Sequence, residues 1–322
     1  MRHATVRQLQ VFVAAAKSLS FARVAEQLHL TPAAVSFQIK QLESTSGFPL
    51  FERIGKKASL TEAGRSLLSY AEIVMTALHD ADQTMLALKG GSAGHVSVGL
   101  VSTAKYIVPH ILARFRSLYP SVTIRLLDGN RREILNFLAN GDVDLAVMGR
   151  PPEDFDVEAQ AFAPHPTVLI AAPAHPLAER SRIRIAALAG EAFVLREDGS
   201  GTRSLLSAFF EDAAFKPRVA MTSSSNETIK QAVMAGMGIA GLSRHTIGLE
   251  LALGLLKVLR VEGWPLMRTW FVAHRRRMPL MPLHDRLRDF FVSEGPSIIA
   301  ELERTYSGAA SKHAHTNSLL KR

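Results

Sequence analysis

Two short helix patterns joined by a tight turn lie at residues 20–28 and 31–42, and they constrain the fold of this chain more than any other feature. Ser20 and Thr31 can each accept a hydrogen bond from the free backbone N–H groups at a helix start, and Pro32 is tolerated at a first helical position. Apolar residues recur every three or four positions and are expected to pack inward: Val24, Ala25, Leu28, Val35, Ile39 and Leu42. The sequence therefore predicts a helix-turn-helix.

The segments around this helix pair complete a DNA-reading module. An earlier helix is predicted from the spacing of Leu9, Phe12, Val13 and Ala16, and residues 49–60 are typical of a wing, two short strands around a basic glycine turn. The second helix of the pair keeps small and polar residues on its outer face, which lets a helix enter the major groove. We predict that nine residues of this helix and the wing contact DNA: Thr31, Ala33, Ser36, Phe37, Gln38, Lys40, Arg53, Lys56 and Lys57.

Positive charge is concentrated at the two ends of the chain. Residues 1–65 contain nine Lys and Arg against four Asp and Glu, which gives this segment +5 of the chain's net +9. The segment from Ser307 onward adds +3 from Lys312, Lys321 and Arg322, so the middle of the chain is nearly neutral. Surface lysines can serve solubility alone, but a basic head on a near-neutral body is the pattern expected for contact with the DNA backbone.

The composition excludes several other classes of protein. A length of 322 residues suits two or three domains, and the absence of cysteine excludes disulfides and thiolate chemistry. The apolar run at residues 11–16 is too short for a secretory signal, and no apolar run is long enough to span a membrane. We therefore expect a soluble, cytoplasmic protein that does not act at a membrane.

A long helix is predicted from Thr61 to about Lys89, followed by a hinge at residues 90–94. At 1.5 Å per residue it would be roughly 40 Å long, too long to be covered by the small segment before it. Its apolar residues step by four and three, as in a coiled-coil seam that pairs two chains: Leu67, Ala71, Val74, Leu78, Ala81, Met85 and Leu88. The alternative is a helix packed on its own domain, because two of the seam positions are only alanine.

From His95 the pattern changes to alternating strands and helices, which predicts an α/β body with parallel sheets. The pattern restarts at residues 168–172, so we expect two α/β lobes joined by crossover strands, with a ligand cleft between them. The predicted boundaries are 1–60 for the winged helix-turn-helix, 61–89 for the linker helix, 90–306 for the two-lobed domain and 307–322 for a disordered tail. Within the two-lobed domain, lobe I covers about 95–163 and 268–306, and lobe II covers about 164–267.

Hydroxyl, glycine and cationic residues follow several predicted strands and suit an anionic ligand in the cleft. Ser102 and Thr103 lie between a strand and a helix, where hydroxyls and free N–H groups can hold an anion. Residues 199–203 repeat this arrangement in the second lobe, and Arg150 ends a strand of the first. The candidate effector-binding residues are Ser102, Thr103, Lys105, Arg150, Ser200, Gly201, Thr202, Arg203, Asn226 and Glu227. Any of the small polar residues can alternatively serve only as a cap or a turn.

Signals of catalysis and of metal binding are weak. Residues 236–241 match GxGxxG, but they follow a predicted helix and precede a strand, the reverse of the dinucleotide-binding context. The chain has no GxxxxGK loop, no GxSxG elbow and no HExxH, and its histidines show no ligand spacing apart from His313 and His315 in the tail. We expect no enzymatic activity, no cofactor and no metal site.

The order of these elements resembles the LysR-type transcriptional regulators over the chain to about residue 306. The residues that carry the resemblance lie at 9–12, 20–21, 25, 28, 34–36, 38–39, 42–43, 50–53 and 60–64. Within the body, four segments look like the activators of Calvin-cycle (RuBisCO) operons: 102–106, 148–152, 199–203 and 226–233. Many family members have Thr-Gln-Pro-Ala at the start of the recognition helix, whereas this chain has Thr-Pro-Ala-Ala at 31–34. Base reading is therefore expected to depend on Ser36, Phe37, Gln38 and Lys40.

The resemblance implies a winged helix-turn-helix, a dimerisation helix and an effector domain built like a periplasmic binding protein. It also implies an activator of carbon-fixation genes that binds a two-fold operator on double-stranded DNA as a homodimer or homotetramer, with RNA polymerase as a further partner. The implied effector is a small anion, either a phosphorylated metabolite or a nicotinamide nucleotide. Three alternatives stay open: a regulator of another metabolic operon, a solute-binding protein of a transport system, and a metabolic enzyme. The basic head argues against the second, and the lack of catalytic motifs argues against the third.

Overall fold

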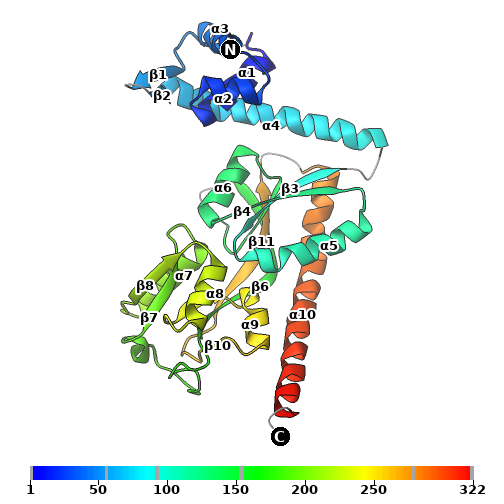
Figure 1. Cartoon of the computed structure of the whole chain (residues 1–322). Helices are drawn as coiled ribbons and strands as arrows, with labels where there is room; N and C mark the ends of the chain where they lie inside the picture. The colour runs from blue at the N-terminus through cyan, green and yellow to red at the C-terminus, as the bar shows by residue number, and fades with distance from the viewer. Residues whose placement is uncertain (1–2, 55–56, 91–93, 152–155, 277–279, 320–322) are drawn as a thin grey trace. The chain divides into compact units, whose positions relative to one another are not determined.

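The computed structural model describes residues 3–54, 57–90, 94–151, 156–276 and 280–319. The chain divides into two compact units, Met1–Gly91 and Ser92–Arg322 (Figure 1). The first unit contains the predicted DNA-reading module and the long helix, and the second contains the α/β body.

The first unit has three short helices, a two-stranded hairpin and one long helix. Its elements are α1 (Val6–Ser18), α2 (Phe21–Gln27), α3 (Pro32–Ser46), β1 (Phe51–Ile54), β2 (Lys57–Leu60) and α4 (Glu62–Gly90). The side chains of Thr5, Ser20 and Thr31 accept hydrogen bonds from backbone N–H groups in the first turns of α1, α2 and α3. The capping residues therefore start these helices as the sequence predicted.

The core of the first unit lies between its three short helices, the hairpin and the beginning of α4. Its fully buried apolar side chains include Val11, Phe12, Ala15, Val24, Val35, Ile39 and Leu42. Phe51 of β1 meets the rings of Phe12 and Phe21 edge to face, with centroids 5.8 and 5.4 Å apart. These contacts hold the hairpin against the helices, which fixes where the wing lies relative to α3.

The first two positions of the predicted coiled-coil seam belong to this core instead, which corrects that part of the sequence-based prediction. Ala71 is 1% exposed and Leu67 is half-buried, and both pack with the core of the three short helices. The later seam positions Val74, Leu78, Ala81 and Met85 are exposed, and the side chain of Leu88 lies outside the described residues. A helix face that packs on its own domain has the same spacing as one that packs on a partner, so the sequence pattern did not separate the two.

The second unit contains two lobes, and each has its own hydrophobic core. Lobe I contains β3 (His95–Val101), η1 (Ala104–Tyr106), α5 (Val108–Leu118), β4 (Thr123–Gly129), α6 (Arg131–Asn140), β5 (Leu145–Met148), β11 (Leu266–Arg275) and α10 (Pro282–Leu319). Strand β3 pairs in parallel with β4 on one side and with β5 on the other, as predicted, while β11 adds to β5 in the antiparallel direction.

Lobe II repeats the alternation of strands and helices. It contains η2 (Ile185–Leu188), β7 (Ala192–Arg196), α7 (Gly201–Asp212), β8 (Arg218–Ser223), α8 (Asn226–Met234), β9 (Ala240–Ser243), η3 (Arg244–Thr246), α9 (Gly248–Ala252) and β10 (Lys257–Val258). Strands β7 and β8 pair in parallel. Between α8 and β9, Gly236 and Gly238 have positive φ angles of 80° and 146°. The GxGxxG match is thus the turn after a helix.

Two long strands connect the lobes. Strand β6 (Val157–Ala171) runs from lobe I into lobe II and β11 returns, so they pair antiparallel, from Arg275 opposite Val157 to Leu266 opposite Thr167 (Figure 1). The sequence predicted this strand only from Val168, whereas the strand also includes Pro164 and Pro166, which are unfavourable inside a strand. Among the pairs along these strands, His165 of β6 and Arg268 of β11 lie side by side between the lobes.

The C-terminal helix is longer than predicted, and the prediction of a disordered tail from Ser307 is wrong for the described residues. The sequence indicated a helix at residues 283–291, whereas α10 extends from Pro282 to Leu319 with Pro296 inside it. Gly295 packs against Phe162, with the position of a Cβ on Gly295 only 3.0 Å from the ring. Packing on lobe I therefore carries the helix past a local breaker, and once formed a helix extends at one hydrogen bond per residue.

Candidate functional site

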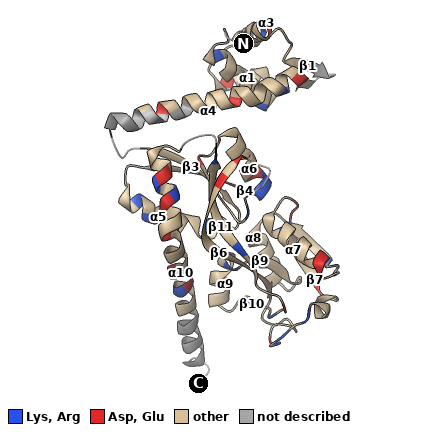
Figure 2. Cartoon of the chain, turned by 180° about the vertical axis from the view of Figure 1, so that it is seen from behind, with Lys and Arg blue, Asp and Glu red and all other residues tan. Residues whose placement is uncertain are grey.

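Helix α3 presents most of the predicted DNA-contacting residues at the surface of the first unit. Thr31, Ala33, Phe37 and Lys40 are exposed, and Ser36 and Gln38 are half-buried. The ring of Phe37 is 57% exposed although it is apolar, which suits contact with a thymine methyl group. The hydroxyl of Thr31 accepts a hydrogen bond from the N–H of Ala34 at 3.1 Å, so it already serves as the helix cap. Figure 2 shows Lys and Arg along the helices of this unit.

The hairpin of β1 and β2 occupies the place of the predicted wing. Its strands pair from Phe51 opposite Leu60 to Ile54 opposite Lys57. Lys56 and the side chains of Arg53 and Lys57 lie outside the described residues. Their contact with the DNA backbone stays a prediction from the sequence.

Replacing Gln38 or Lys40 with alanine is expected to weaken operator binding without unfolding the protein. A good base contact contributes about 1–3 kcal/mol of discrimination, so Gln38→Ala should lower specific affinity by about 5- to 150-fold. Lys17→Ala is the control, because Lys17 pairs with Glu72 at 3.3 Å and lies outside α3. Gel-shift titrations with operator and unrelated DNA measure the effect. Wild-type affinity in both α3 variants would show that α3 does not read the operator.

A cavity of about 590 Å³ lies between the two lobes of the second unit. Six of the ten predicted effector-binding residues line it: Ser102, Thr103, Arg150, Ser200, Gly201 and Thr202. The first two follow β3 and the last three begin α7, so the two strand–helix junctions read from the sequence do face one cavity. Its volume suits a small metabolite.

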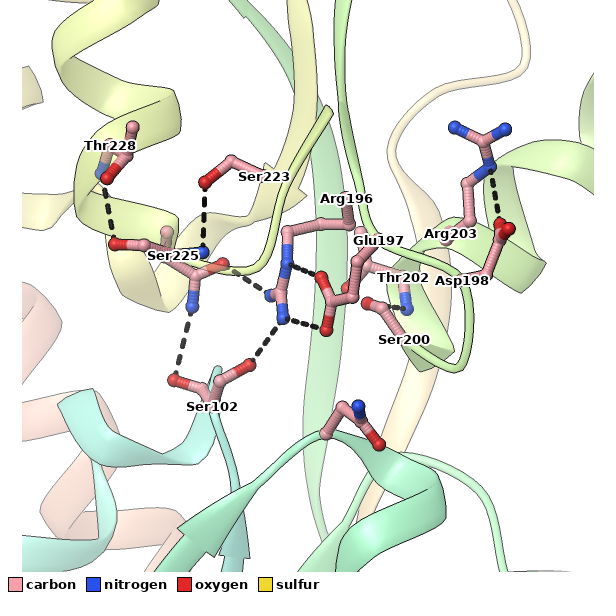
Figure 3. Close-up of polar contacts among 12 residues, drawn as sticks. Ser102, Arg196, Glu197, Asp198, Ser200, Thr202, Arg203, Ser223, Ser225 and Thr228 are labelled. Carbon is pink, nitrogen blue, oxygen red and sulfur yellow. Dashed lines mark hydrogen bonds and ion pairs between the residues drawn. The ribbon is translucent and has the colours of Figure 1, made fainter. Parts of the chain in front are cut away.

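Four predicted residues lie elsewhere. Lys105 forms an ion pair with Asp128, and together with Asn226 and Glu227 it lines a neighbouring hollow of about 430 Å³ rather than the main cavity. Arg203 turns to the other side of α7, where its Nε is 4.0 Å from a carboxylate oxygen of Asp198 (Figure 3). The reason is helical geometry, since the lining residues Gly201, Ser204, Leu205 and Ala208 recur at the three- and four-residue spacing of one helix face, and Arg203 falls on the opposite face.

Several cavity residues were missed by the sequence analysis. Arg131 lies in the first turn of α6, Arg196 at the end of β7, and Arg268 and His165 on the crossover strands. The start of α6 is blue in Figure 2. Arg131 follows a strand in the same way as Thr103 does, so the rule used for Thr103 would have found it. Arg268 and His165 lie inside strands, where no local signal marks a ligand contact.

The first turn of α7 is arranged to receive an anion. The hydroxyl of Ser200 caps the helix, accepting a hydrogen bond from the N–H of Thr202 at 3.3 Å. A Cβ on Gly201 would lie 3.6 Å from Arg131 Cδ and 3.6 Å from Arg268 Nη1, so both arginines approach this turn closely. The partial positive charge of a helix N-terminus and two guanidinium groups thus meet at one point.

Arg196 connects the two lobes beside the cavity. Its Nη2 donates to Ser102 Oγ in lobe I at 2.8 Å and its Nη1 donates to Asn226 Oδ1 at 2.6 Å. Asn226 Nδ2 in turn donates to the carbonyl oxygen of Ser102 at 3.1 Å, and Glu197 receives two hydrogen bonds from the guanidinium (Figure 3). Arg196 is 3% exposed, so this network is a buried tie between the lobes rather than a free cation. Asn226 therefore contacts two cavity-lining residues, Ser102 and Arg196, without lining the main cavity itself.

The charges around the cavity have one sign. Among its described lining residues there are four arginines and no acidic residue. Burial lowers the pKa of Arg131, and the neighbouring Arg150 lowers it further; burial also lowers the pKa of Arg268 to about 10. Both groups remain charged at neutral pH. Arginine side chains around a cavity whose described lining contains no carboxylate favour an anionic ligand.

Metal-binding clusters and membrane-spanning helices are both absent from the described residues. No cluster of three or more His, Cys, Asp or Glu is placed there to hold a metal ion. No described helix is both long and apolar enough to cross a membrane.

Comparisons with known proteins agree with this geometry. Residues 6–65 match the bacterial regulatory helix-turn-helix protein of the lysR family, and residues 89–296 match the LysR substrate binding domain. The HTH-type transcriptional regulator CfxR of Cupriavidus necator is 44% identical over 308 residues, which cover 96% of this chain and 96% of that protein. The RuBisCO operon transcriptional regulator of Allochromatium vinosum is 42% identical over 292 residues, covering 91% of this chain and 97% of that protein.

A solved structure is similar to the α/β body of the chain. The regulatory domain of Synechocystis PCC6803 CcmR, in complex with 2-PG, is 36% identical, with a TM-score of 0.61, and the match covers 62% of this chain and 97% of that one. Regulators of this family bind DNA through the helix-turn-helix, oligomerise and bind small effectors. The matched domains and relatives are regulators and not enzymes, and the chain belongs to the LysR family of bacterial transcriptional regulators.

Proposed function

We propose that this protein activates carbon-fixation genes and that a small phosphorylated metabolite in the interlobe cavity controls it. The observation that carries the proposal is the cavity itself, whose described lining contains four arginines, the N-terminus of α7 and no acidic side chain. The relatives with 42–44% identity include a RuBisCO operon regulator, and the CcmR regulatory domain is a complex with 2-PG, that is 2-phosphoglycolate.

A phosphorylated metabolite suits the cavity better than a nicotinamide nucleotide. The described lining contains no Phe, Tyr or Trp against which a nicotinamide or adenine ring could stack. Its apolar part is limited to short aliphatic side chains such as Val101, Leu135 and Leu205. Guanidinium groups, hydroxyls and a helix N-terminus bind phosphate oxygens directly.

The tie between the lobes offers a route from ligand to DNA. Ser102 lines the cavity and also accepts the hydrogen bond of Arg196, which belongs to the other lobe. A ligand that bonds to Ser102 competes with this tie, so it binds the two lobe arrangements with different affinity. Such a difference is what a ligand needs to shift a conformational equilibrium.

The proposed regulator works as a homo-oligomer on double-stranded DNA. The exposed seam residues of α4, Val74, Leu78, Ala81 and Met85, pair two chains, so two copies of α3 read a two-fold operator. RNA polymerase is the further partner that an activator requires. The compartment is the cytoplasm, because the chromosome lies there.

The experiment that tests this proposal measures how the effector changes DNA binding. The full-length protein is titrated onto DNA from upstream of the carbon-fixation genes, with and without 2-phosphoglycolate, and effector binding is measured by calorimetry. We expect specific binding whose affinity or footprint changes with the effector. If no phosphorylated intermediate of carbon fixation binds, the proposed effector is wrong; if this DNA is not preferred over unrelated DNA, the proposed target is wrong.

Replacing Thr202 with valine is expected to weaken effector binding and leave DNA binding intact. Thr202 is 3% exposed and lines the cavity, and its hydroxyl receives a hydrogen bond from Arg268 at 3.4 Å. Loss of one hydroxyl contact should weaken binding of 2-phosphoglycolate by about 2- to 12-fold. Thr228→Val is the control, because Thr228 is exposed on α8 and does not line the cavity. Equal calorimetric affinities for the two variants would remove Thr202 from the site.

A further inference from the structure

Two buried polar residues lie side by side on the crossover strands beneath the cavity. His165 of β6 is directly opposite Arg268 of β11 in the antiparallel register, and both line the cavity. His165 is 1% exposed, so a ligand group that contacts it is removed from solvent. Because the pair lies where the chain passes between lobes, a ligand that reaches it touches both.

Neither residue has its hydrogen-bonding capacity satisfied within the described part of the chain. Both ring nitrogens of His165 and Nε of Arg268 are buried without a partner. The terminal nitrogens of Arg268 do have partners, since Nη1 donates to the carbonyl oxygen of Gly201 at 3.1 Å and Nη2 donates to Thr167 Oγ1 at 3.2 Å and to Thr202 Oγ1 at 3.4 Å. A buried polar atom without a partner is unfavourable by about 1–3 kcal/mol, so three on two neighbouring residues indicate a missing ligand group.

The protonation state of His165 defines which group that is. Burial lowers the pKa of His165 well below its usual range, and Arg268 and then His245 lower it further. At neutral pH the ring is uncharged and carries one N–H. That N–H and the Nε–H of Arg268 are two neighbouring donors, one of them on a cation. A carboxylate and a phosphate can each accept from two donors through two oxygens and carry the matching charge; with the phosphate assigned to the first turn of α7, a carboxylate is the group left for this pair.

The ring of His165 is held in place before any ligand arrives. It stacks on Trp270 with centroids 3.7 Å apart and planes 12° apart. Trp270 is itself fixed, since it is fully buried and its Nε1 donates to Nδ1 of His245 at 3.1 Å. Gly149 covers one edge of the ring, and a Cβ on Gly149 would lie 2.9 Å from Nδ1 of His165. A site whose donors are already positioned loses little entropy on binding.

We propose that His165 and Arg268 form an inner carboxylate subsite, and that His165 makes the regulator selective for phosphorylated carboxylic acids over phosphate esters without a carboxylate. The proposal rests on the proposed function, and it assigns the phosphate of the effector to the first turn of α7 and Arg131. The two subsites together require a short ligand with an anionic group at each end. A sugar phosphate that presents only hydroxyls leaves the charge of Arg268 unpaired and binds more weakly.

The test compares three ligands by calorimetry on the full-length protein. They are 2-phosphoglycolate, ethyl phosphate, which has a methyl group in place of the carboxylate, and glycolate, which lacks the phosphate. We expect the wild-type protein to bind 2-phosphoglycolate most tightly. His165→Phe keeps the stacking on Trp270 but removes both ring nitrogens. It should weaken binding of 2-phosphoglycolate by about 10-fold or more and leave ethyl phosphate unchanged.

Two further variants keep the test decisive. His274→Phe removes another buried histidine that also has an unpartnered nitrogen but does not line the cavity, and it should keep the wild-type preference. Gly149→Ala changes no polar group but places a methyl against His165, so it should lose the preference as His165→Phe does. Thermal melting and operator binding show whether each variant is folded. If the His165→Phe protein does not fold, the ligand preference of Gly149→Ala tests the subsite in its place.

The outcomes separate the two proposals. If His165→Phe and Gly149→Ala bind 2-phosphoglycolate like the wild type, or lose both phosphorylated ligands equally, the inner carboxylate subsite is wrong and the effector cavity is unaffected. If the wild-type protein binds neither phosphorylated ligand, the proposed function fails together with the subsite. Selective loss of 2-phosphoglycolate in both variants, with His274→Phe unchanged, supports the subsite.

Discussion

Replacing Arg131 with leucine is expected to weaken binding of 2-phosphoglycolate by about 10- to 150-fold, because a hydrogen bond between charged groups contributes about 1.5–3 kcal/mol. Arg131 lines the cavity and approaches the first turn of α7, and the bond that its Nε donates is to the carbonyl oxygen of Arg150 at 3.1 Å. The fold should tolerate the change, because leucine keeps much of the side chain's apolar stem and removes a charge that Arg150 repels. Calorimetry at two salt concentrations measures the loss.

Arg203→Leu is the matched control for Arg131→Leu. Both arginines lie in the first turn of a helix, but Arg203 points away from the cavity toward Asp198. It should therefore keep the wild-type affinity for the effector. If Arg203→Leu loses effector binding and Arg131→Leu does not, the assignment of Arg131 to the cavity is wrong. The sequence-based prediction that Arg203 binds the effector would then hold.

Replacing Leu78 with aspartate is expected to abolish dimer formation at working concentrations. Leu78 is 37% exposed on α4, with Val74 41% and Met85 58% exposed along the same seam. Pairing would bury two unpaired carboxylates, and self-association should weaken by at least about 100-fold. Operator binding should fall with it, since one half-site gives much less binding energy than two. Light scattering gives the mass, and gel shifts give the operator affinity.

Ser69→Asp supplies the control for Leu78→Asp. It places the same charge on the same helix, at an exposed residue off the seam. Ser69→Asp should leave the dimer intact, because an exposed helix residue that lies off the seam tolerates a charge. If Leu78→Asp has the wild-type mass in solution, α4 does not pair the chains through this face, and another surface forms the oligomer.

The pattern of α4 shows how far spacing alone can be trusted. The sequence predicted one continuous seam, but Ala71 and Leu67 pack inside their own unit and only the later positions are exposed. The spacing of apolar residues indicates that one face of a helix is buried, but it does not indicate whether the same chain or a partner chain buries it. The same limit applies to α10, which the sequence did not extend past Phe291 and which continues past Gly295 where that residue packs beside Phe162.

What the sequence by itself determined are the features that depend on near neighbours in the chain. Caps at Ser20 and Thr31, the helical spacing of apolar residues and the alternation of strands and helices are local, so they predicted the winged helix-turn-helix and the α/β body. The strand–helix junctions at Ser102 and Thr202 were found in the same way. These signals work because backbone hydrogen bonds and side-chain periodicity are set within a few residues.

Only the tertiary structure decided which cations share the cavity. Arg203 was predicted and points elsewhere, whereas Arg268 was missed because an arginine inside a strand resembles any solvent-facing residue. Its place beside His165 follows from the antiparallel register of β6 and β11, two strands far apart in the sequence. Register between distant strands is set by the packing of both lobes, and no local pattern encodes which side chains it brings together.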